Sequence, residues 1–344
     1  MNRSGHGRSS RWSGAALLVA LSSLLLAAGP GGSGQPVQPA QPGAAGRPLE
    51  SAPCSLRVMV EDLRGALADG SPSLQRYMLT LLKEAALRMP VDELRAAFAA
   101  ERDPKVLEAL GIALATRASN TGEPAVIESI VDRARGDADP ALRAAALSGL
   151  RGVGSVEMMN KARGATYADF LRDPAPAVRA AAVDKLVHED AQVYFGHEGP
   201  VSDAAVKAAA ASSDPALAAR LLAEVSMEAA GPESVATLVQ QLGSADPTLR
   251  AAAARALGGV GGAHSETARR ALVERYGADD AREVRVAILE GLVQLGLGGA
   301  RPVLESLRGV DPELGPEIDA WLQVLAMNLQ QWSIILREKQ RLRP

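Results

Sequence analysis

The chain has 344 residues, of which 47% are hydrophobic but only 3% aromatic, and its formal net charge is −3. The hydrophobic fraction is that of a folded protein, and the abundant alanine and leucine favour helices over strands, which argues against an all-β fold. A sequence pI near 5.9 disfavours a protein that holds nucleic acid through phosphate contacts. The single cysteine, Cys54, excludes an intrachain disulfide and a zinc site built from CxxC pairs.

Residues 1–28 have the pattern of a signal peptide or an N-terminal anchor. Three arginines without an acidic residue precede the apolar run at 15–28, which is the charge-then-apolar order of a secretory signal. The run is shorter than the roughly 20 residues that a membrane-spanning helix needs, yet no clear cleavage site follows it. We therefore predict an exported protein, periplasmic or secreted, and an uncleaved membrane anchor stays open as the alternative.

Residues 29–53 are rich in proline, glycine and glutamine. Such a composition buries too little apolar surface to offset the entropy of ordering, so it predicts a disordered linker. The first 49 residues contain four arginines and no acidic residue. The remainder of the chain is therefore more acidic than the chain as a whole.

One sequence motif, called the phrase, recurs along the rest of the chain at intervals of 31 to 41 residues. Each copy begins with Asp or Asp-Pro, which suits the N-cap and first position of a helix, and continues with an apolar stripe at helical spacing. A second amphipathic segment separates each copy from the next. A fixed period of this length predicts a solenoid of stacked helix pairs. The clear copies lie at 139–154, 173–187 and 246–261, a looser one at 280–296, and degenerate ones begin at residues 103, 214 and 311.

The predicted fold is an all-α, right-handed solenoid of antiparallel helix pairs, with about six to seven units between two caps. Residues 54–102 are helical by pattern without a clean phrase, which predicts an N-terminal helical cap before the repeats at 103–310. Residues 311–344 have an apolar stripe that includes Trp321 and Trp332, followed by a basic tail. We predict a C-terminal capping helix there; docking to a partner or to an anionic membrane surface is the alternative.

The combination of Asp-Pro, apolar-Arg, Ala-Ala and Leu-Gly in these copies resembles HEAT-like repeats of the phycobilisome-lyase type, over about residues 100–312. In that family the arginine of the phrase commonly pairs with an aspartate of an adjacent unit. Ala218 occupies the arginine position of the copy at 214, so we expect a break there. The resemblance implies a structural ladder that joins Arg143, Arg179, Arg250 and Arg285 to Asp139, Asp173, Asp246 and Asp280.

The longest interval contains two His-Glu pairs, at 188–189 and 197–198, and two of the scarce aromatics, Tyr194 and Phe195. Deoxyhypusine hydroxylase, a HEAT-like enzyme, builds a di-iron site from four such pairs, but only two occur here and neither has HExxH spacing. We interpret both pairs as solvent-facing groups in a loop or at a helix end, and expect no metal or other cofactor. The alternative for the pairs is contact with a partner. The two aromatics either pack under the neighbouring repeat or anchor a partner.

No GxSxG, P-loop or Cys/His nucleophile pattern indicates catalysis, so we predict a protein that is not an enzyme. The resemblance implies a partner protein on the concave face of the solenoid. We predict a cell-envelope interaction scaffold without nucleic acid, touching a membrane only through an uncleaved N-terminal segment. The alternatives are an enzyme-associated subunit, such as a lyase-like chaperone of a prosthetic group, and a membrane-tethered assembly factor. The candidate interaction residues are Ser148, Asp184, His188, Tyr194, Phe195, His197, Arg255, Glu283, Glu290 and Gln294.

Overall fold

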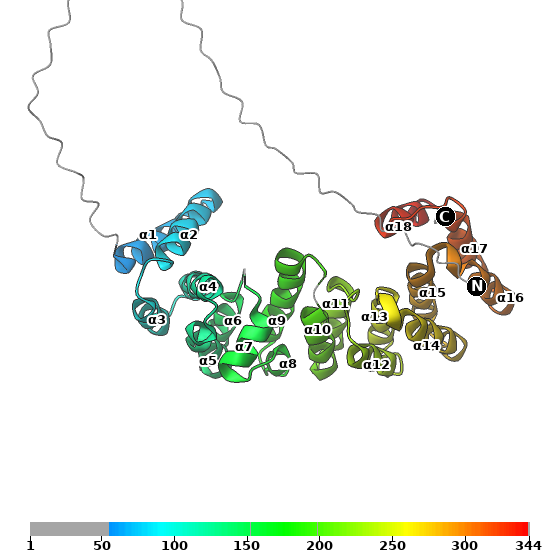
Figure 1. Cartoon of the computed structure of the whole chain (residues 1–344), viewed down its shortest axis with the longest axis horizontal. Coiled ribbons are helices and arrows are strands. Elements are labelled where there is room, and N and C mark those ends of the chain that lie inside the picture. Colours follow the sequence, from blue (N-terminus) through cyan, green and yellow to red (C-terminus); the bar gives the residue numbers. More distant parts are fainter. Residues whose placement is uncertain (1–54, 152, 198, 343–344) are drawn as a thin grey trace, which may run out of the picture. The chain divides into compact units, whose positions relative to one another are not determined.

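The computed structural model describes residues 55–151, 153–197 and 199–342 (Figure 1). The predicted signal or anchor and the predicted linker lie outside the described residues. The described residues belong to one compact unit, and within them all regular structure is helical. None of the described helices has both the length and the apolar character that crossing a membrane requires.

Three helices precede the repeats: α1 (Leu56–Asp69), α2 (Pro72–Ala86) and α3 (Val91–Ala100). Ser55 caps α1 by accepting from the amide of Val58, and Gly70 ends the helix in the left-handed conformation with φ of 70°. The three helices all contact α4 (Pro104–Thr121), the first helix of the repeats. They occupy the segment that the sequence predicts as the N-terminal cap.

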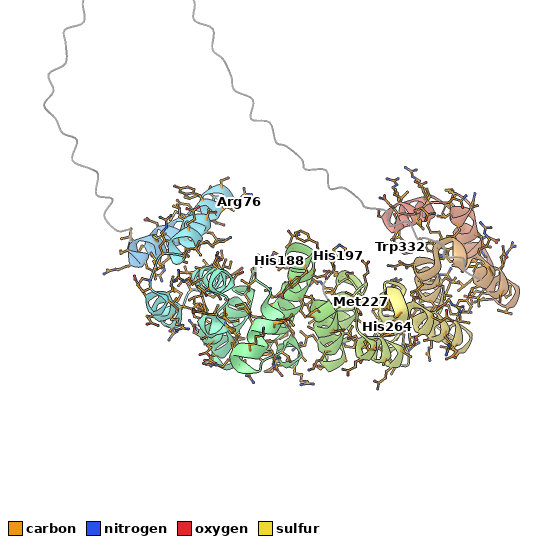
Figure 2. The ribbon with its side chains drawn as sticks, in the orientation of Figure 1. Arg76, His188, His197, Met227, His264 and Trp332 are labelled. Atoms are coloured by element: carbon orange, nitrogen blue, oxygen red, sulfur yellow. The ribbon has the colours of Figure 1, made fainter. Side chains whose placement is uncertain are left out.

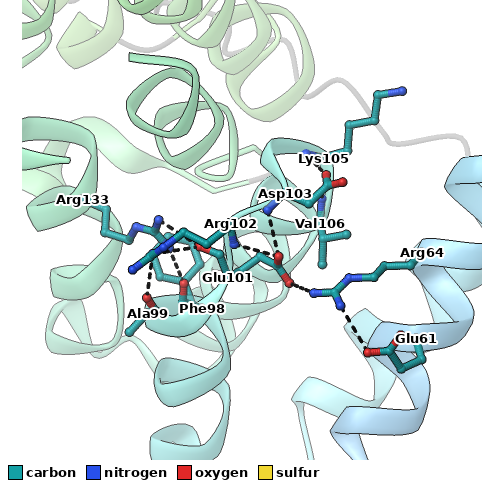
Figure 3. A network of polar contacts seen from close by, with 10 residues as sticks. All are labelled: Glu61, Arg64, Phe98, Ala99, Glu101, Arg102, Asp103, Lys105, Val106 and Arg133. Atoms are coloured by element: carbon teal, nitrogen blue, oxygen red, sulfur yellow. Dashed lines mark hydrogen bonds and ion pairs between the residues drawn. The ribbon is translucent and has the colours of Figure 1, made fainter. Parts of the chain in front are cut away.

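A buried carboxylate, Glu101, fastens this cap to the repeats (Figure 3). One of its oxygens accepts a hydrogen bond of 2.5 Å from Arg64 of α1, and the other accepts from the two backbone N–H groups that follow it, both at 2.8 Å. Arg133 donates to the carbonyls of Phe98 and Glu101, and its guanidinium lies 5.4 Å from the centre of the Phe98 ring. A charge-assisted network thus replaces the repeat motif at this end of the solenoid.

The repeats form two rows of helices, in which each helix contacts the next one of its row (Figure 1). The first row contains the helices of the repeated phrase: α4, α6 (Pro140–Ser148), α9 (Pro176–Glu189), α11 (Pro215–Glu224), α13 (Pro247–Gly258) and α15 (Arg282–Gly296). The second row contains α5 (Glu128–Gly136), α7 (Ser155–Arg163), α10 (Gly199–Ala211), α12 (Pro232–Gln241) and α14 (Ser265–Ala278). The described chain is therefore an all-α solenoid, as the repeat predicts.

Several short elements connect the rows or close the chain. The helix α8 (Tyr167–Phe170) has a single turn, and α16 (Arg301–Val310) packs on the helix that follows it. Three 3₁₀ turns and one π-helical turn complete the described structure: η1 (Pro124–Ile127), η3 (Gly262–His264), η4 (Leu297–Ala300) and the π turn η2 (Asp190–Tyr194).

Each arginine of the phrase connects two units. Arg143 donates to the backbone carbonyl of Asp137 in its own unit at 2.9 Å, and to both carboxylate oxygens of Asp173 in the next unit at 2.9 and 3.0 Å. Arg250 repeats the arrangement with the carbonyl of Ser244 at 2.9 Å and with Asp279 at 2.8 and 3.1 Å. Such bidentate pairs fix both distance and orientation between neighbouring helices.

The carboxylate that receives the arginine lies two residues before the helix cap, and this corrects the predicted ladder. Asp279 takes the place that the sequence assigns to Asp280, and it also accepts from the amide of Ala281, the N-cap of α15. Asp139 and Asp246 are themselves N-caps, whose side chains accept hydrogen bonds from backbone N–H groups of the first helical turn. In the described chain no arginine hydrogen-bonds Asp139, Asp246 or Asp280, so placing these three in the ladder was wrong.

The ladder is weak in the middle of the chain because two copies have serine at the receiving position, Ser212 and Ser244. Arg179 donates to the carbonyls of Asp173 and Pro174 in its own unit, but in the next unit it reaches only the cap residue Asp214, with 3.8 Å between guanidinium and carboxylate. Ala218 stands where the next arginine would be, and its buried methyl group makes no polar contact. At the far end Arg285 contacts both Asp311 at 2.8 Å and Glu313 at 2.6 Å.

Glycines in the phrase bring neighbouring helices into backbone contact. A Cβ atom on Gly258 would lie 2.5 Å from the Cα of Gly291, and one on Gly111 would lie 2.9 Å from the Cα of Gly149. Gly258 is the last residue of α13, and Gly259 caps the helix with φ of −84°.

The C-terminal segment consists of two helices, α17 (Gly315–Leu325) and α18 (Trp332–Arg341), where the sequence predicted one. Asn328 in the turn between them has φ of 53°. The fold-back stacks Trp321 on Trp332, with ring centres 6.0 Å apart and planes 9° from parallel. Lys339, which belongs to the predicted basic tail, is buried with its ammonium 2.9 Å from Glu317 and 5.1 Å from the Trp321 ring centre.

Candidate interaction site

A groove of about 770 Å³ lies where the ends of three first-row helices meet α18. Figure 2 marks Met227 and Trp332, two of its lining residues. The remaining lining comes from the end of α11 with its following loop (222–228), the end of α13 with a glycine-rich loop (255–262), the last turns of α15 (290–295), Leu336 and Asp190.

The two loops of the groove are held together by backbone contacts. The amide of Gly261 donates to the carbonyl of Glu228 at 3.2 Å. A Cβ atom at Gly261 would lie 2.8 Å from that same oxygen, so the approach requires glycine. The groove walls are therefore set by close main-chain packing, which gives the site a defined shape.

Three of the predicted interaction residues meet in this groove: Arg255, Glu290 and Gln294. Arg255 donates to the Glu290 carboxylate at 2.9 Å, across the junction between α13 and α15. Gln294 lies beside Gly259, its amide nitrogen 3.5 Å from where a Cβ would be. The helical alignment of the sequence thus finds one wall of the groove.

Four other predicted residues of the first-row helices lie outside the groove lining. Asp184 is exposed and pairs with Arg220 of α11 at 2.7 Å. His188 is half-buried, and burial together with the nearby Lys185 charge lowers its pKa. Ser148 is half-buried at the end of α6, and Glu283 is exposed in the first turn of α15.

The segment 188–202 is largely helical, and the first His-Glu pair lies at the end of α9. The helix α9 continues into the π turn, Phe195 stops it with φ of 54°, and α10 begins at Gly199. Phe195 is 72% exposed, whereas Tyr194 packs against the hydrophobic core with its hydroxyl over Gly154. Tyr194 therefore packs against the core as the first alternative expects, whereas Phe195 does not. His197 is exposed, with Nδ1 3.7 Å from the Glu228 carboxylate.

Asp190 lines the groove, and the sequence did not single it out. It is only 5% exposed, and its Oδ2 accepts from the amide of Ser226 at 3.0 Å. Its Oδ1 is buried and has no hydrogen-bond partner within the described residues. Burial raises the pKa of this carboxyl. No sequence signal marks it, because it lies in the π turn beyond the repeated phrase.

Glu189 is fully buried, so its interpretation as a solvent-facing group was wrong. Its carboxylate accepts from Ser155 Oγ at 2.5 Å, from Lys185 Nζ at 2.7 Å and from the amide of Val156 at 3.3 Å. The Ser155 hydroxyl also lies 2.6 Å from the hydroxyl of Tyr167. This network joins α7, α8 and α9 where the repeat is least regular.

Serine, lysine, tyrosine and carboxylate can together perform nucleophilic chemistry, but this cluster is closed. Its four side chains are between 0% and 3% exposed, and burial lowers the pKa of Lys185 and raises that of Tyr167. We therefore assign the cluster to stability. In the part of the chain that the structure describes, no three His, Cys, Asp or Glu side chains gather where they could bind a metal ion.

Comparison with known proteins finds a family match over part of the chain. The family model for HEAT repeats matches residues 202–293, from α10 through most of α15. An engineered protein with a crystal structure from the Northeast Structural Genomics Consortium is 18% identical, over 83% of this chain and 77% of that one, with a TM-score of 0.41. None of the curated proteins compared with the chain matches it.

The fold defines an α-solenoid. Its residues 202–293 are similar to HEAT repeats, and this stretch supplies most of the groove lining from α11, α13 and α15.

Proposed function

We propose that this chain is a protein-interaction scaffold without chemistry of its own, and that its partner binds along the first-row helices. The groove at the ends of α11, α13 and α15 is the observation that supports this most directly. It combines fixed backbone walls, an aromatic side chain and both signs of charge, which is the composition of a protein-binding site. Solenoids of stacked repeats commonly act as such scaffolds because they offer extended surfaces.

We further propose that the scaffold functions in the cell envelope and that its repeats are of the phycobilisome-lyase type. The support for export is the arginine-rich start followed by the apolar run at 15–28. The support for the repeat type is the phrase of Asp-Pro, apolar-Arg, Ala-Ala and Leu-Gly. Both belong to the sequence and are independent of the groove.

Site-specific photo-crosslinking in the native cells tests the binding surface. A photoreactive amino acid at Gln294 in the groove should give a discrete adduct with a partner protein, whereas one at Arg270 should not. Arg270 is the matched control, because it is exposed on α14 of the second row. Equal adducts from both positions, or adducts from Arg270 alone, would contradict the proposed surface.

Cell fractionation followed by N-terminal sequencing tests the proposed location. An exported, processed protein should be recovered from the envelope without Met1 and without the apolar run at 15–28. Retention of Met1 in a membrane fraction would instead favour the tethered assembly factor. Recovery of the unprocessed chain from the cytoplasm would contradict export altogether.

A further inference from the structure

We infer that the groove binds an extended peptide in which a lysine or arginine is flanked by apolar side chains, and that Asp190 receives the cation. This deepens the proposed scaffold function and rests on it. The site combines a buried carboxylate with an unused oxygen, an excess of negative charge and a partly exposed apolar wall.

The buried oxygen of Asp190 is the primary observation. Buried polar atoms in folded proteins are nearly always hydrogen-bonded, and a carboxylate oxygen without a donor is costly to keep. Asp190 Oδ2 is held by the Ser226 amide, while Oδ1 has no donor within the described residues. An ammonium or guanidinium group entering the groove would provide that donor and an opposite charge.

The charges around the groove select a cation over an anion. Among the described residues, Arg255 is the one cation that lines the groove, and this guanidinium is engaged by Glu290 at 2.9 Å. Glu224 is likewise engaged, by Arg220 at 2.9 Å. Glu228 and Asp190 remain as carboxylates without a lysine or arginine partner in the described chain. Complementary charge of this kind steers a basic ligand and excludes an acidic one.

The wall formed by α18 is the reason why we expect apolar side chains beside the basic residue of the peptide. Trp332 and Leu336 are partly exposed and line the groove opposite the loop that contains Met227. Stacking on Trp321 fixes the orientation of the Trp332 ring. A rigid aromatic in a defined concavity is the usual anchor for an apolar side chain of a bound peptide.

Fluorescence anisotropy with labelled seven-residue peptides tests the inference on the purified chain. The probes differ only at the centre of a leucine-flanked sequence, which contains arginine, norleucine or glutamate. We expect the arginine peptide to bind about tenfold or more tightly than the other two. Asp190→Asn should remove this preference. Glu283→Gln, at an exposed acidic position outside the groove lining, should preserve it.

Equal affinity for the three peptides, or an arginine preference that survives in Asp190→Asn, would overturn the inference. Circular dichroism shows whether that variant folds. If it does not, the affinities of the unmodified chain for the three peptides decide whether the inference holds. The proposed scaffold function fails separately. A partner crosslinked through Gln294 without any arginine preference leaves the scaffold standing and removes the peptide specificity.

Discussion

A comparison of two junctions between first-row helices shows how far the repeat motif determines the contacts between neighbouring units. Between α13 and α15, Gly258 meets Gly291 in backbone contact, and Arg250 is bound bidentately to the buried Asp279. Between α9 and α11 the equivalent arginine, Arg179, only approaches Asp214, at 3.8 Å. The first junction obeys the motif in full, and the second departs from it.

The departure coincides with the features that distinguish this chain from a plain solenoid. The helix α9 runs past its expected end into the π turn, which places Asp190 against the loop after α11. The buried network around Glu189 lies one residue earlier. Where the motif is regular, its residues stack neighbouring helices on one another. Where the motif is interrupted, polar side chains such as those of Asp190 and Glu189 take other roles.

Loss of the Glu189 carboxylate should have the largest effect on the irregular region. Glu189→Ala leaves the buried Lys185 ammonium without its counter-charge, and we expect a loss of about 3–5 kcal/mol in the free energy of unfolding. Urea-induced unfolding followed by circular dichroism measures it. Glu157→Ala removes an exposed carboxylate of α7, the helix that contributes Ser155 to the network, and should cost less than about 1 kcal/mol. Equal costs would show that the network is not the element that holds this region together.

The regular junction should be most sensitive at its glycines. Gly258→Ala places a methyl group against the backbone of Gly291 and forces α13 and α15 apart, at an expected cost of up to about 3 kcal/mol. The matched control is Gly65→Ala, because Gly65 lies inside α1 with nothing within 4 Å of its Cβ position. That variant should gain roughly 0.5–1 kcal/mol from helix propensity. A gain in stability in both variants would show that Gly258 is not needed for close packing of α13 and α15.

Arginine truncation compares the two junctions directly. Arg250→Ala removes the bidentate contact to a buried carboxylate, although Arg275 still reaches Asp279 at 2.6 Å. We expect a loss of about 2 kcal/mol there, intermediate between exposed and fully buried pairs. Arg179→Ala should cost less, about 1 kcal/mol, because its one ion contact is long and it otherwise loses only hydrogen bonds to backbone carbonyls that Arg250→Ala loses as well. The difference between the two unfolding midpoints tests whether the ladder is uneven.

The sequence predicts the fold well because its signal is periodic. Helix-capping aspartates, prolines at the first helical position and apolar stripes recur in most units, so one misassigned copy changes little. Asp103, Asp139, Asp214 and Asp246 all cap helices as expected. The copy at 173 contains an additional Pro-Ala before the helix begins. This moves the cap to Ala175 and makes Asp173 an arginine partner instead.

The candidate site was only partly predictable because it depends on contacts between distant segments. Arg255, Glu290 and Gln294 follow from helical phase, which local sequence contains. The role of Asp190 depends on a π turn, and that of Trp332 depends on the turn that separates α17 from α18. Neither turn has a strong local signal, since both are stabilised by tertiary packing. Burial of Glu189 was missed because Ser155 and Val156, two of the three residues that donate to its carboxylate, lie on α7 and are distant in the sequence.

The smallest expected effect is a pH dependence of stability, and it distinguishes a carboxylate bound by arginines, Asp279, from one that is buried without such a partner, Asp190. Hydrogen bonds from Arg250 and Arg275 outweigh burial and lower the pKa of Asp279. Asp279 therefore stabilises the fold above its unfolded pKa near 4, and this contribution is lost as the pH falls through its lower folded pKa.

Asp190 has the opposite sign, because burial raises its pKa. Its charge destabilises the folded chain above the raised pKa, and this penalty disappears once the pH falls below the unfolded value near 4. Asp190→Asn should therefore gain up to about 1 kcal/mol at neutral pH and nothing in acid, as measured by urea unfolding across the pH range. Asp279→Asn should show the reverse, a loss at neutral pH that shrinks in acid. A stability loss for Asp190→Asn at neutral pH would mean that the Asp190 charge is already compensated, and that the groove has no need of a cation.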